Sequence, residues 1–270
     1  MSKVWFITGT SRGFGRQWAE AALERGDRVA ATARDIDTLR PLAARFGDRV
    51  LPIALDVTDR NAVFAVVAKA QERWGALDVV VNNAGYGLFG MVEEVDEAQA
   101  RAQMEVNFFG ALWVTQAVLP VMRSQRSGHI IQVSSVAGVF SLPGQGLYHA
   151  SKFALEGLSG SLAMEVRDFG IAVTLLEPVG YATDWMGSSA VHSAELSEYG
   201  DFRAGMLRPS AKRGDPAATK EAILTIVDAD TPPLRVFFGA AALPLMRRDY
   251  ENRIAEWERW DHVAKAAAGA

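Results

Sequence analysis

The chain has 270 residues, a formal net charge of −4, four histidines and no cysteine. This length suits one α/β domain, and the lack of cysteine excludes disulfides and thiolate metal sites. The chain carries no basic block that would bind nucleic acid or an anionic lipid surface, no apolar run of about 18 residues and no signal-peptide pattern. We therefore expect a cytoplasmic protein that acts on a small molecule, without a metal, a nucleic-acid partner or a membrane anchor.

Short apolar segments alternate with longer amphipathic segments along the chain. Strands are predicted at 4–8, 28–33, 50–54, 77–81, 129–134, 172–177 and 235–238, and several are continuously apolar, as strands buried on both faces are. Helices are predicted at 13–25, 36–46, 60–74, 97–124, 147–169 and 216–229. This alternation predicts an α/β fold, a doubly wound parallel sheet of about seven strands with helices on both faces and right-handed crossovers.

Two segments fall outside that alternation, although we expect residues 1–270 to form a single domain. Residues 181–215 show no clear periodicity, and a loop of this length in a compact domain is usually functional, so we interpret it as a substrate loop. The pattern of residues 243–265 predicts a last helix, within a C-terminal helical extension at about 240–265. Near one face of this helix lie Tyr250, Ile254, Trp257 and Asp261.

Three glycines follow the first strand with the spacing G-x-x-x-G-x-G, at Gly9, Gly13 and Gly15. Glycine lets the backbone turn tightly and approach a pyrophosphate, and the following helix offers free N–H groups and the positive end of its dipole. An ordinary glycine-rich turn is the alternative. The position of all three at a strand-to-helix junction favours a phosphate-binding loop.

Two arginines indicate which dinucleotide the loop prefers. The second strand ends at Ala33, where an acidic residue would bind the adenosine ribose and repel a 2′-phosphate, and Arg34 follows it. Arg12 lies within the glycine loop, and two guanidinium groups can bracket a phosphate. This pattern predicts NADP(H). The alternative is two solvated arginines, and Asp35 could weaken the preference by pairing with Arg34.

Tyr148 and Lys152 are four residues apart at the start of a predicted helix and therefore share one face of it. An adjacent ammonium can lower the pKa of a phenol from its ordinary value near 10, which would make Tyr148 a general acid or base. Ser135 ends the strand that lies thirteen residues before Tyr148, at the edge of the sheet where ligands bind. Its hydroxyl can bind the oxygen of a substrate beside the tyrosine.

In this order and spacing, the chain resembles the short-chain dehydrogenase/reductase family, and its NADP-preferring carbonyl reductases in particular. The resemblance covers residues 4 to about 185, and its motifs are Thr8-Gly9-x-x-x-Gly13-x-Gly15, Asp56, Asn82-Asn83-Ala84-Gly85, Asn107, Ser135, Tyr148, Lys152 and Thr183. It implies a Rossmann fold and an enzyme that transfers a hydride between NADP(H) and a carbonyl or alcohol group.

The resemblance also implies a role for each catalytic residue. Tyr148 transfers the proton, Ser135 orients the substrate, and Lys152 lowers the pKa of the tyrosine and holds the nicotinamide ribose. Asn107 bends its helix and holds a water that connects the lysine to solvent, although it could also be an ordinary polar helix residue. The implied cofactor contacts are Gly9, Ser11, Arg12, Gly13, Phe14, Gly15, Arg34, Asp56, Val57, Asn83, Ala84, Gly85, Tyr148, Lys152, Pro178, Val179 and Thr183. Asp56 would contact the adenine, or could simply cap a turn.

Val179 departs from the family pattern, which has Pro-Gly where this chain has Pro178-Val179. A β-branched residue disfavours positive φ. If the backbone needs glycine there, cofactor binding suffers. If it does not, the valine narrows the substrate pocket.

The expected substrate pocket contains Phe89, Val136, Phe140, Gln145, Trp185 and Met186. Apolar side chains dominate this set, so we expect a fairly hydrophobic ketone or secondary alcohol and a ketoreductase activity. Core packing is the alternative for about half of the set, and His149 either adds a polar contact or points away.

The family commonly forms a four-helix interface between subunits, and small residues on the helix after Tyr148 would permit it (Ala150, Ala154, Gly157 and Ser161). We therefore expect a homodimer or homotetramer, unless these residues pack within the subunit. The main alternative function is a non-catalytic NADP-binding redox sensor, which would be expected to lack the tyrosine or the lysine.

Overall fold

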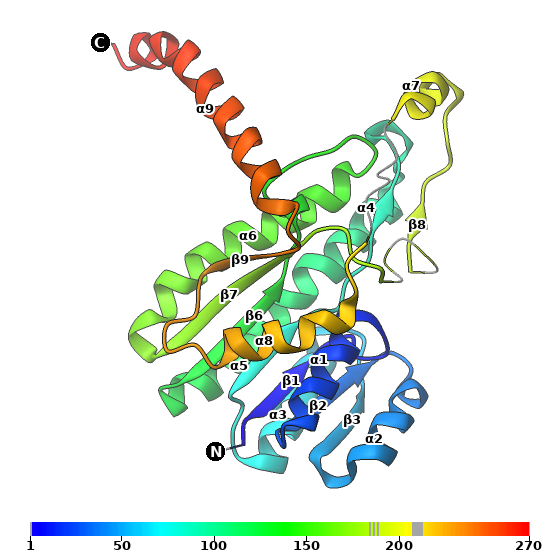
Figure 1. Cartoon of the computed structure of the whole chain (residues 1–270), viewed down its shortest axis with the longest axis vertical. Coiled ribbons are helices and arrows are strands. Elements are labelled where there is room, and N and C mark those ends of the chain that lie inside the picture. The colour runs from blue at the N-terminus through cyan, green and yellow to red at the C-terminus, as the bar shows by residue number, and fades with distance from the viewer. Residues whose placement is uncertain (1, 184, 186, 188, 207–212, 270) are drawn as a thin grey trace.

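The computed structural model describes residues 2–183, 185, 187, 189–206 and 213–269. Its centre is a parallel sheet with the strand order β3-β2-β1-β4-β6-β7-β9 (Figure 1). The strands are β1 (Val4–Ile7), β2 (Arg28–Ala33), β3 (Val50–Ala54), β4 (Val79–Asn82), β6 (Gly128–Val133), β7 (Ile171–Pro178) and β9 (Arg235–Phe238). The predicted seven-stranded, doubly wound sheet is confirmed.

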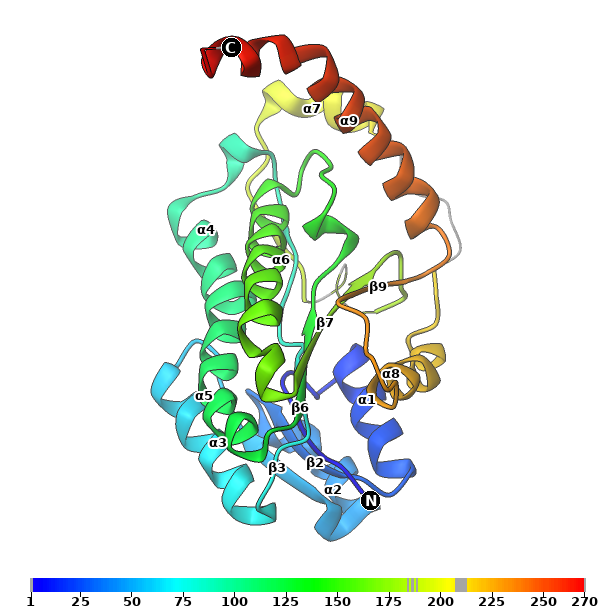
Figure 2. The same ribbon diagram turned by 90° about the vertical axis from the view of Figure 1, so that its left-hand side faces the viewer.

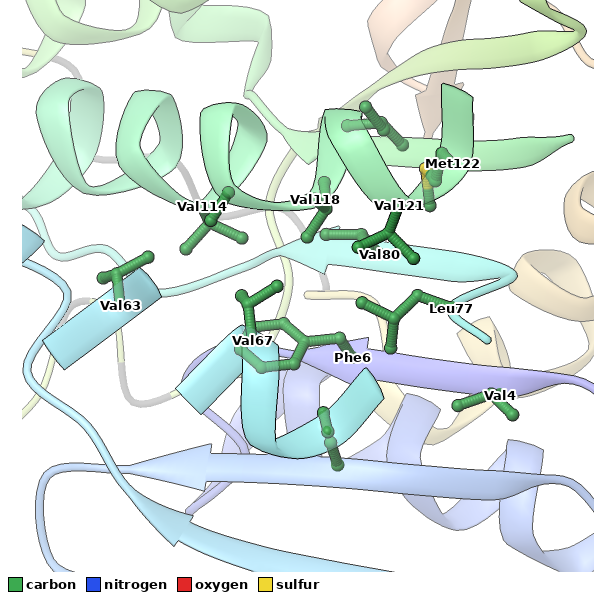
Figure 3. Close-up of a cluster of buried hydrophobic side chains, with 14 of the residues drawn as sticks. Val4, Phe6, Val63, Val67, Leu77, Val80, Val114, Val118, Val121 and Met122 are labelled. Carbon is green, nitrogen blue, oxygen red and sulfur yellow. The ribbon is translucent and has the colours of Figure 1, made fainter. Parts of the chain in front are cut away.

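Helices cover both faces of this sheet (Figure 2). One buried cluster packs α3 (Arg60–Trp74), α5 (Gly110–Gln125) and α6 (Gly146–Val166) against one face. A second cluster packs α1 (Gly13–Glu24), α2 (Arg40–Phe46) and α8 (Thr219–Val227) against the other. Figure 3 shows the first cluster, in which Val67 of α3 and Val118 of α5 lie over Phe6 and Val80.

The helix predicted at 97–124 contains an irregularity that the apolar pattern did not indicate. It consists of α4 (Glu97–Met104), a π-helical turn (Glu105–Phe109) and α5. Asn107 lies inside the wide turn, where its side chain is 2% exposed. Single π-helical turns within α-helices occur frequently at functional sites.

The segment 181–215 contains short elements that the sequence did not predict. Strand β8 (Val191–His192) pairs in parallel with β5 (Leu88–Phe89), and the helix α7 (Gly200–Gly205) follows. A strand of two residues is too short to show a periodic pattern in the sequence. The two paired strands, β5 and β8, are also about a hundred residues apart in the chain. The chain then forms α8, β9 and a long last helix, α9 (Ala242–Ala267).

The sheet order reverses direction between β1 and β4, because the chain builds β2 and β3 on one side of β1 and continues on the other side with β4. In doubly wound sheets, ligands bind in the crevice outside the carboxyl ends of the strands at this switch point. None of the described helices is long and apolar enough to cross a membrane. The described residues also contain no group of three acidic, histidine or cysteine side chains that could hold a metal ion.

Candidate active site

The glycine loop lies at the switch point, between the end of β1 and the start of α1. Gly9 and Gly13 have positive φ values of 69° and 58°, a conformation that favours glycine. A Cβ on Gly15 would lie 2.4 Å from the carbonyl oxygen of Gly9, so the first turn of α1 packs directly on the loop. The N-terminus of a helix so placed offers unpaired backbone N–H groups and a positive dipole end to a phosphate.

Residues after β4 hold this loop in place. The side chain of Asn83 donates to the carbonyl oxygens of Thr8 at 2.9 Å and Gly9 at 3.0 Å. The hydroxyl of Thr8 accepts from the backbone N–H groups of Asn83 and Ala84, both at 2.9 Å. Asn83 and Ala84 were expected to contact the cofactor. In the structure they hold the glycine loop, through the Asn83 side chain and the backbone N–H groups of both residues.

Arg12 and Arg34 are exposed at the carboxyl edge of the sheet. Arg12 is the exposed N-cap residue of α1, and Arg34 is exposed directly after β2. The carboxylate of Asp35 accepts from the N–H of Asp37 at 3.0 Å, as the cap of a short 3₁₀ turn. Among the described residues it forms no ion pair with Arg34, so it does not neutralise that guanidinium.

Asp56 follows β3 and caps a turn, as its alternative interpretation proposed. Its Oδ1 accepts from the N–H of Thr58 at 2.9 Å and from the Thr58 hydroxyl at 2.8 Å. Asp56 itself remains exposed, while Val57 is buried. A Cβ on Gly110 would lie 2.7 Å from the side chain of Val57, which therefore packs on α5.

Asn107 ties the helical irregularity to the loop after β4. Its side chain accepts from the N–H of Tyr86 at 3.1 Å and donates to the carbonyl oxygen of the same residue at 3.0 Å. It also donates to the Ser151 hydroxyl of α6 at 3.2 Å. Gly85 passes close by, since a Cβ there would lie 3.1 Å from Asn107 Oδ1 and 3.8 Å from Lys152 Nζ. Asn107 and Lys152 therefore share one site.

Ser135 and Tyr148 meet at the carboxyl end of β6. Tyr148 is 5% exposed, and its burial raises the pKa of the phenol to about 12, against a smaller lowering by its hydrogen bond with Ser135. The Ser135 hydroxyl also accepts from the N–H of Ala137 at 3.1 Å and donates to the carbonyl oxygen of Pro178 at 3.4 Å. The Ser135 and Tyr148 hydroxyl groups therefore lie beside one another.

Lys152 is buried one turn further along α6. Its ammonium donates to the carbonyl oxygen of Val133 at 2.7 Å and lies 5.8 Å from the centre of the Tyr148 ring. Burial lowers the pKa of Lys152 to about 8, and the Glu156 carboxylate opposes that shift. Burial therefore dominates the pKa of the Tyr148 phenol in this arrangement. The lowering expected from the adjacent ammonium stays a prediction.

The departure at Val179 causes no backbone strain. Val179 has negative φ, since Arg126 is the one non-glycine residue with positive φ in the described part of the chain. Its N–H donates to the Phe238 carbonyl at 2.9 Å, and the left-handed turn falls on Gly180, with φ of 65°. A Cβ on Gly239 would lie 2.8 Å from the Val179 side chain, so glycine at 239 makes room for the valine. Of the two alternatives for Val179, the structure favours the one in which the backbone does not need glycine at this position.

Thr183 returns the chain to the glycine loop. Its side chain lies about 4 Å from the position a Cβ would take on Gly13, and its hydroxyl accepts from the N–H of Trp185 at 3.4 Å. The segment after β7 is thereby brought beside the glycine loop after β1.

An aromatic wall covers Tyr148. The Trp185 ring lies 4.9 Å from the Tyr148 ring and 5.1 Å from the Phe89 ring, between centres, and Phe89 stacks on His192 at 5.1 Å. A Cβ on Gly87 would meet the Trp185 ring at 2.7 Å, so glycine there admits the indole. Phe89 and Trp185 belong to the predicted pocket, while His192 was missed because only the pairing of β5 with β8 brings it there.

Other predicted pocket residues lie in the turns next to Ser135 and Tyr148. Gln145 precedes α6 and forms a parallel bridge with Gly90. Val136 and Phe140 belong to the turn after Ser135, in which the Phe140 N–H donates to the Val136 carbonyl at 3.0 Å. Met186 lies outside the described residues.

His149 points away from the reacting groups and holds that turn. Its Nδ1 lies 2.9 Å from the carbonyl oxygen of Ala137, and its Nε2 accepts from the N–H of Leu142 at 3.0 Å. The ring is therefore neutral with its proton on Nδ1. Of the two alternatives for His149, the structure selects the one in which it makes no substrate contact.

A doubly wound sheet, a glycine loop at its switch point and a Ser-Tyr-Lys set at its carboxyl edge define the class of protein. The chain belongs to the short-chain dehydrogenase/reductase family: the family model described as short chain dehydrogenase matches residues 3–193. It is similar to "Oxidoreductase BOA17" of Botryotinia fuckeliana, with 42% identity over 99% of this chain and 100% of that protein.

Two solved structures extend this comparison. A short-chain dehydrogenase from Streptomyces avermitilis superposes with a TM-score of 0.92 and 38% identity, over 98% of each chain. A short chain dehydrogenase from Burkholderia cenocepacia, in complex with NADP, has a TM-score of 0.78 and 26% identity, over 96% of this chain and 97% of the other.

Proposed function

We propose that the chain is an NADP(H)-dependent ketoreductase acting on fairly hydrophobic ketones or secondary alcohols. The observation that carries this proposal is the paired hydroxyl groups of Ser135 and Tyr148, placed between the glycine loop and an aromatic wall. The glycine loop, Thr183 and Lys152 would hold the nicotinamide cofactor, which when bound donates a hydride to the carbonyl carbon or accepts one from the alcohol.

Each site residue then has one task in ketone reduction. The Ser135 and Tyr148 hydroxyls donate to the carbonyl oxygen and orient it. Tyr148 transfers its proton to that oxygen as negative charge develops there. A phenol whose pKa is raised to about 12 is protonated at neutral pH but is a weak acid, so proton transfer from it requires stabilisation of the phenolate. Lys152 stabilises the phenolate left behind, and Asn107 holds the loop and helix against which the lysine packs.

The aromatic wall supports the substrate class. Trp185, Phe89 and His192 present flat rings on the side of Tyr148 where the substrate would lie. A pocket of this kind favours an aryl or extended alkyl ketone over a phosphorylated or highly charged one. The test is to mix the purified chain with NADPH and a panel of aryl, alkyl and charged ketones, and to follow the nicotinamide absorbance. Tight NADPH binding without turnover of any ketone would favour the alternative function, a non-catalytic redox sensor. Such a sensor would be expected to lack either Tyr148 or Lys152.

Arg12 and Arg34 support the preference for NADP(H), and the Burkholderia relative was crystallised with NADP. We expect Arg12→Ala and Arg34→Ala each to raise the KM for NADPH by roughly 10- to 100-fold, because one charge-assisted phosphate contact contributes about 1.5–3 kcal/mol. The KM for NADH should change little. Arg40→Ala, an exposed arginine nearby, is the matched control. A wild-type chain that uses NADH better than NADPH would contradict the assignment.

The pKa of Lys152 predicts how the reduction rate depends on pH. Because burial lowers this pKa to about 8, the ammonium is present below that value and is lost as pH rises through it. We expect the reduction rate to fall over the same range. Glu156→Gln removes the carboxylate that raises the lysine pKa, so the fall should move to lower pH. Glu165→Gln, an exposed site on α6, is the control, and a profile that Glu156→Gln leaves unmoved counts against this role for Lys152.

The predicted four-helix interface remains part of this proposal. On α6, Ala150, Gly157 and Ser161 are exposed and Ala154 is half-buried. The small residues therefore face outward and support a homodimer or homotetramer built on this helix, instead of packing within the subunit.

A further inference from the structure

Glu94, in the short turn Val92–Glu94, carries a carboxylate that is fully buried and bonded to three donors. Its side chain is 0% exposed. It accepts from the backbone N–H groups of Met91 at 2.7 Å and Leu196 at 2.9 Å, and it pairs with the guanidinium of Arg203. The Arg203 guanidinium and the Leu196 N–H lower the pKa of Glu94 to about 2. The carboxylate is therefore charged at neutral pH, and its hydrogen bonds are of the strong, charge-assisted kind.

The three donors come from two distant parts of the chain. Met91 follows β5, whereas Leu196 follows β8 and Arg203 lies on α7. Glu94 and Arg203 are 109 residues apart in the sequence, and α7 lies beside the turn that contains Glu94 (Figures 1 and 2). Glu94 therefore fastens residues 196–203 of the predicted substrate loop to the segment after β5.

The other contacts between these two segments are weaker. Strands β5 and β8 form a separate sheet of two strands with two residues each, and an isolated pair of strands is at best marginally stable. The Tyr199 hydroxyl donates to Glu93 at 2.7 Å, but this bond is exposed and water competes for it. The Ser193 hydroxyl donates to Gln99 at 2.9 Å, without a charge on either side. The position of β8 therefore depends strongly on Glu94.

Strand β8 carries the far end of the aromatic wall. Starting from the reacting tyrosine, the rings follow in the order Tyr148, Trp185, Phe89 and His192, with 4.9, 5.1 and 5.1 Å between successive centres. A small ketone held at the Tyr148 hydroxyl would need only the near end of this wall. A bulky ketone would extend to the Phe89 and His192 rings, and His192 lies four residues before the Leu196 N–H that Glu94 holds.

We propose that Glu94 is a positioning residue that sets the size preference of the substrate site, because it fixes β8 and with it the far end of the aromatic wall. This inference rests on the proposed ketoreductase function. Glu94 acts through His192 and Phe89 and takes no part in proton transfer. The substrate class that the fixed wall selects is a ketone with a flat, apolar group, because such a group packs on aromatic rings.

Kinetics with ketones of two sizes test the size preference. Glu94→Gln keeps the shape of the side chain but removes its charge, and Arg203→Met removes the partner on α7. In either variant we expect the KM for 2-acetonaphthone to rise roughly 10-fold, as for the loss of one hydrogen bond to a charged group. The KM for butan-2-one, kcat for both ketones and NADPH binding should stay as in the wild-type chain.

Glu97→Gln is the matched control, because it removes an exposed carboxylate of α4 that pairs only with the exposed Arg101. It should leave both KM values unchanged. A purely structural role for Glu94 would raise the two KM values equally or weaken NADPH binding. Either of these results, or unchanged KM values in both Glu94→Gln and Arg203→Met, would overturn the proposal.

Hydrogen–deuterium exchange tests the tie to β8 without turnover. The N–H of Ser193 donates to the Phe89 carbonyl at 2.8 Å. In Glu94→Gln, peptides that cover residues 190–197 should exchange roughly 10-fold faster than in the wild-type chain, because local opening becomes easier. Strand β6 should exchange at the same rate in both chains. Equal exchange at 190–197, or faster exchange in β6 as well, contradicts the role of Glu94. A local difference in a chain whose wild type reduces no ketone would instead contradict the proposed function.

Discussion

The Tyr148→Phe variant is expected to reduce ketones about 10²- to 10⁴-fold more slowly than the wild-type chain, the range that a positioned general acid contributes. The ring of Tyr148 packs against Trp185, and phenylalanine keeps that contact while it removes only the hydroxyl group. NADPH binding and the thermal unfolding temperature should therefore change little. The measurement is single-turnover reduction of the best ketone from the panel.

Tyr250→Phe is the matched control for this change, because it also removes one phenolic hydroxyl but lies on α9, outside the glycine loop and the Ser135, Tyr148 and Lys152 set. It should reduce ketones at the wild-type rate. A Tyr148→Phe variant that keeps wild-type activity would show that another group donates the proton, and the mechanism proposed for Ser135, Tyr148 and Lys152 would be abandoned.

Gly15→Ala is expected to abolish cofactor binding at concentrations that saturate the wild-type chain. The new Cβ would lie 2.4 Å from the carbonyl oxygen of Gly9 and 2.5 Å from the side-chain nitrogen of Asn83. Neither can yield without moving the loop, since Asn83 also holds Thr8. Overpacking of this kind costs about 1–3 kcal/mol of folding stability. Binding should be measured by NADPH fluorescence at a temperature where the variant remains folded.

Gly157→Ala provides the control for the effect of a methyl group itself. A Cβ on Gly157 meets no atom within 4 Å, and alanine is favoured over glycine within a helix by about 0.5–1 kcal/mol. This variant should be as stable as the wild-type chain or more so, with unchanged NADPH binding. If Gly15→Ala binds NADPH as tightly as Gly157→Ala does, the glycine loop is not the phosphate site.

Local sequence patterns were sufficient to predict the sheet and the phosphate loop. The seven strands are apolar because both of their faces are buried, and the glycines are required where the backbone turns into α1. Tyr148 and Lys152 were recognisable because four residues on a helix define one face, and Ser135 because it ends a strand at the ligand-binding edge. These features depend on short-range geometry, which the order of residues along the chain determines.

Long-range contacts decided the rest, because no local pattern encodes which distant segments meet. Strand β8 brings His192 to Phe89, and the chain after Thr183 brings Trp185 onto Tyr148. Gly239, which follows β9, explains why a valine is accepted at 179.

The same distinction holds for the two residues at the chemical centre. Their spacing in the sequence determined that Tyr148 and Lys152 share a helix face. Only the tertiary structure decided their proton affinities, because these depend on the depth of burial, on the Glu156 carboxylate near the lysine and on the Ser135 hydroxyl beside the tyrosine. Burial disfavours the charged form of each group, and so it raises the pKa of the phenol and lowers that of the ammonium.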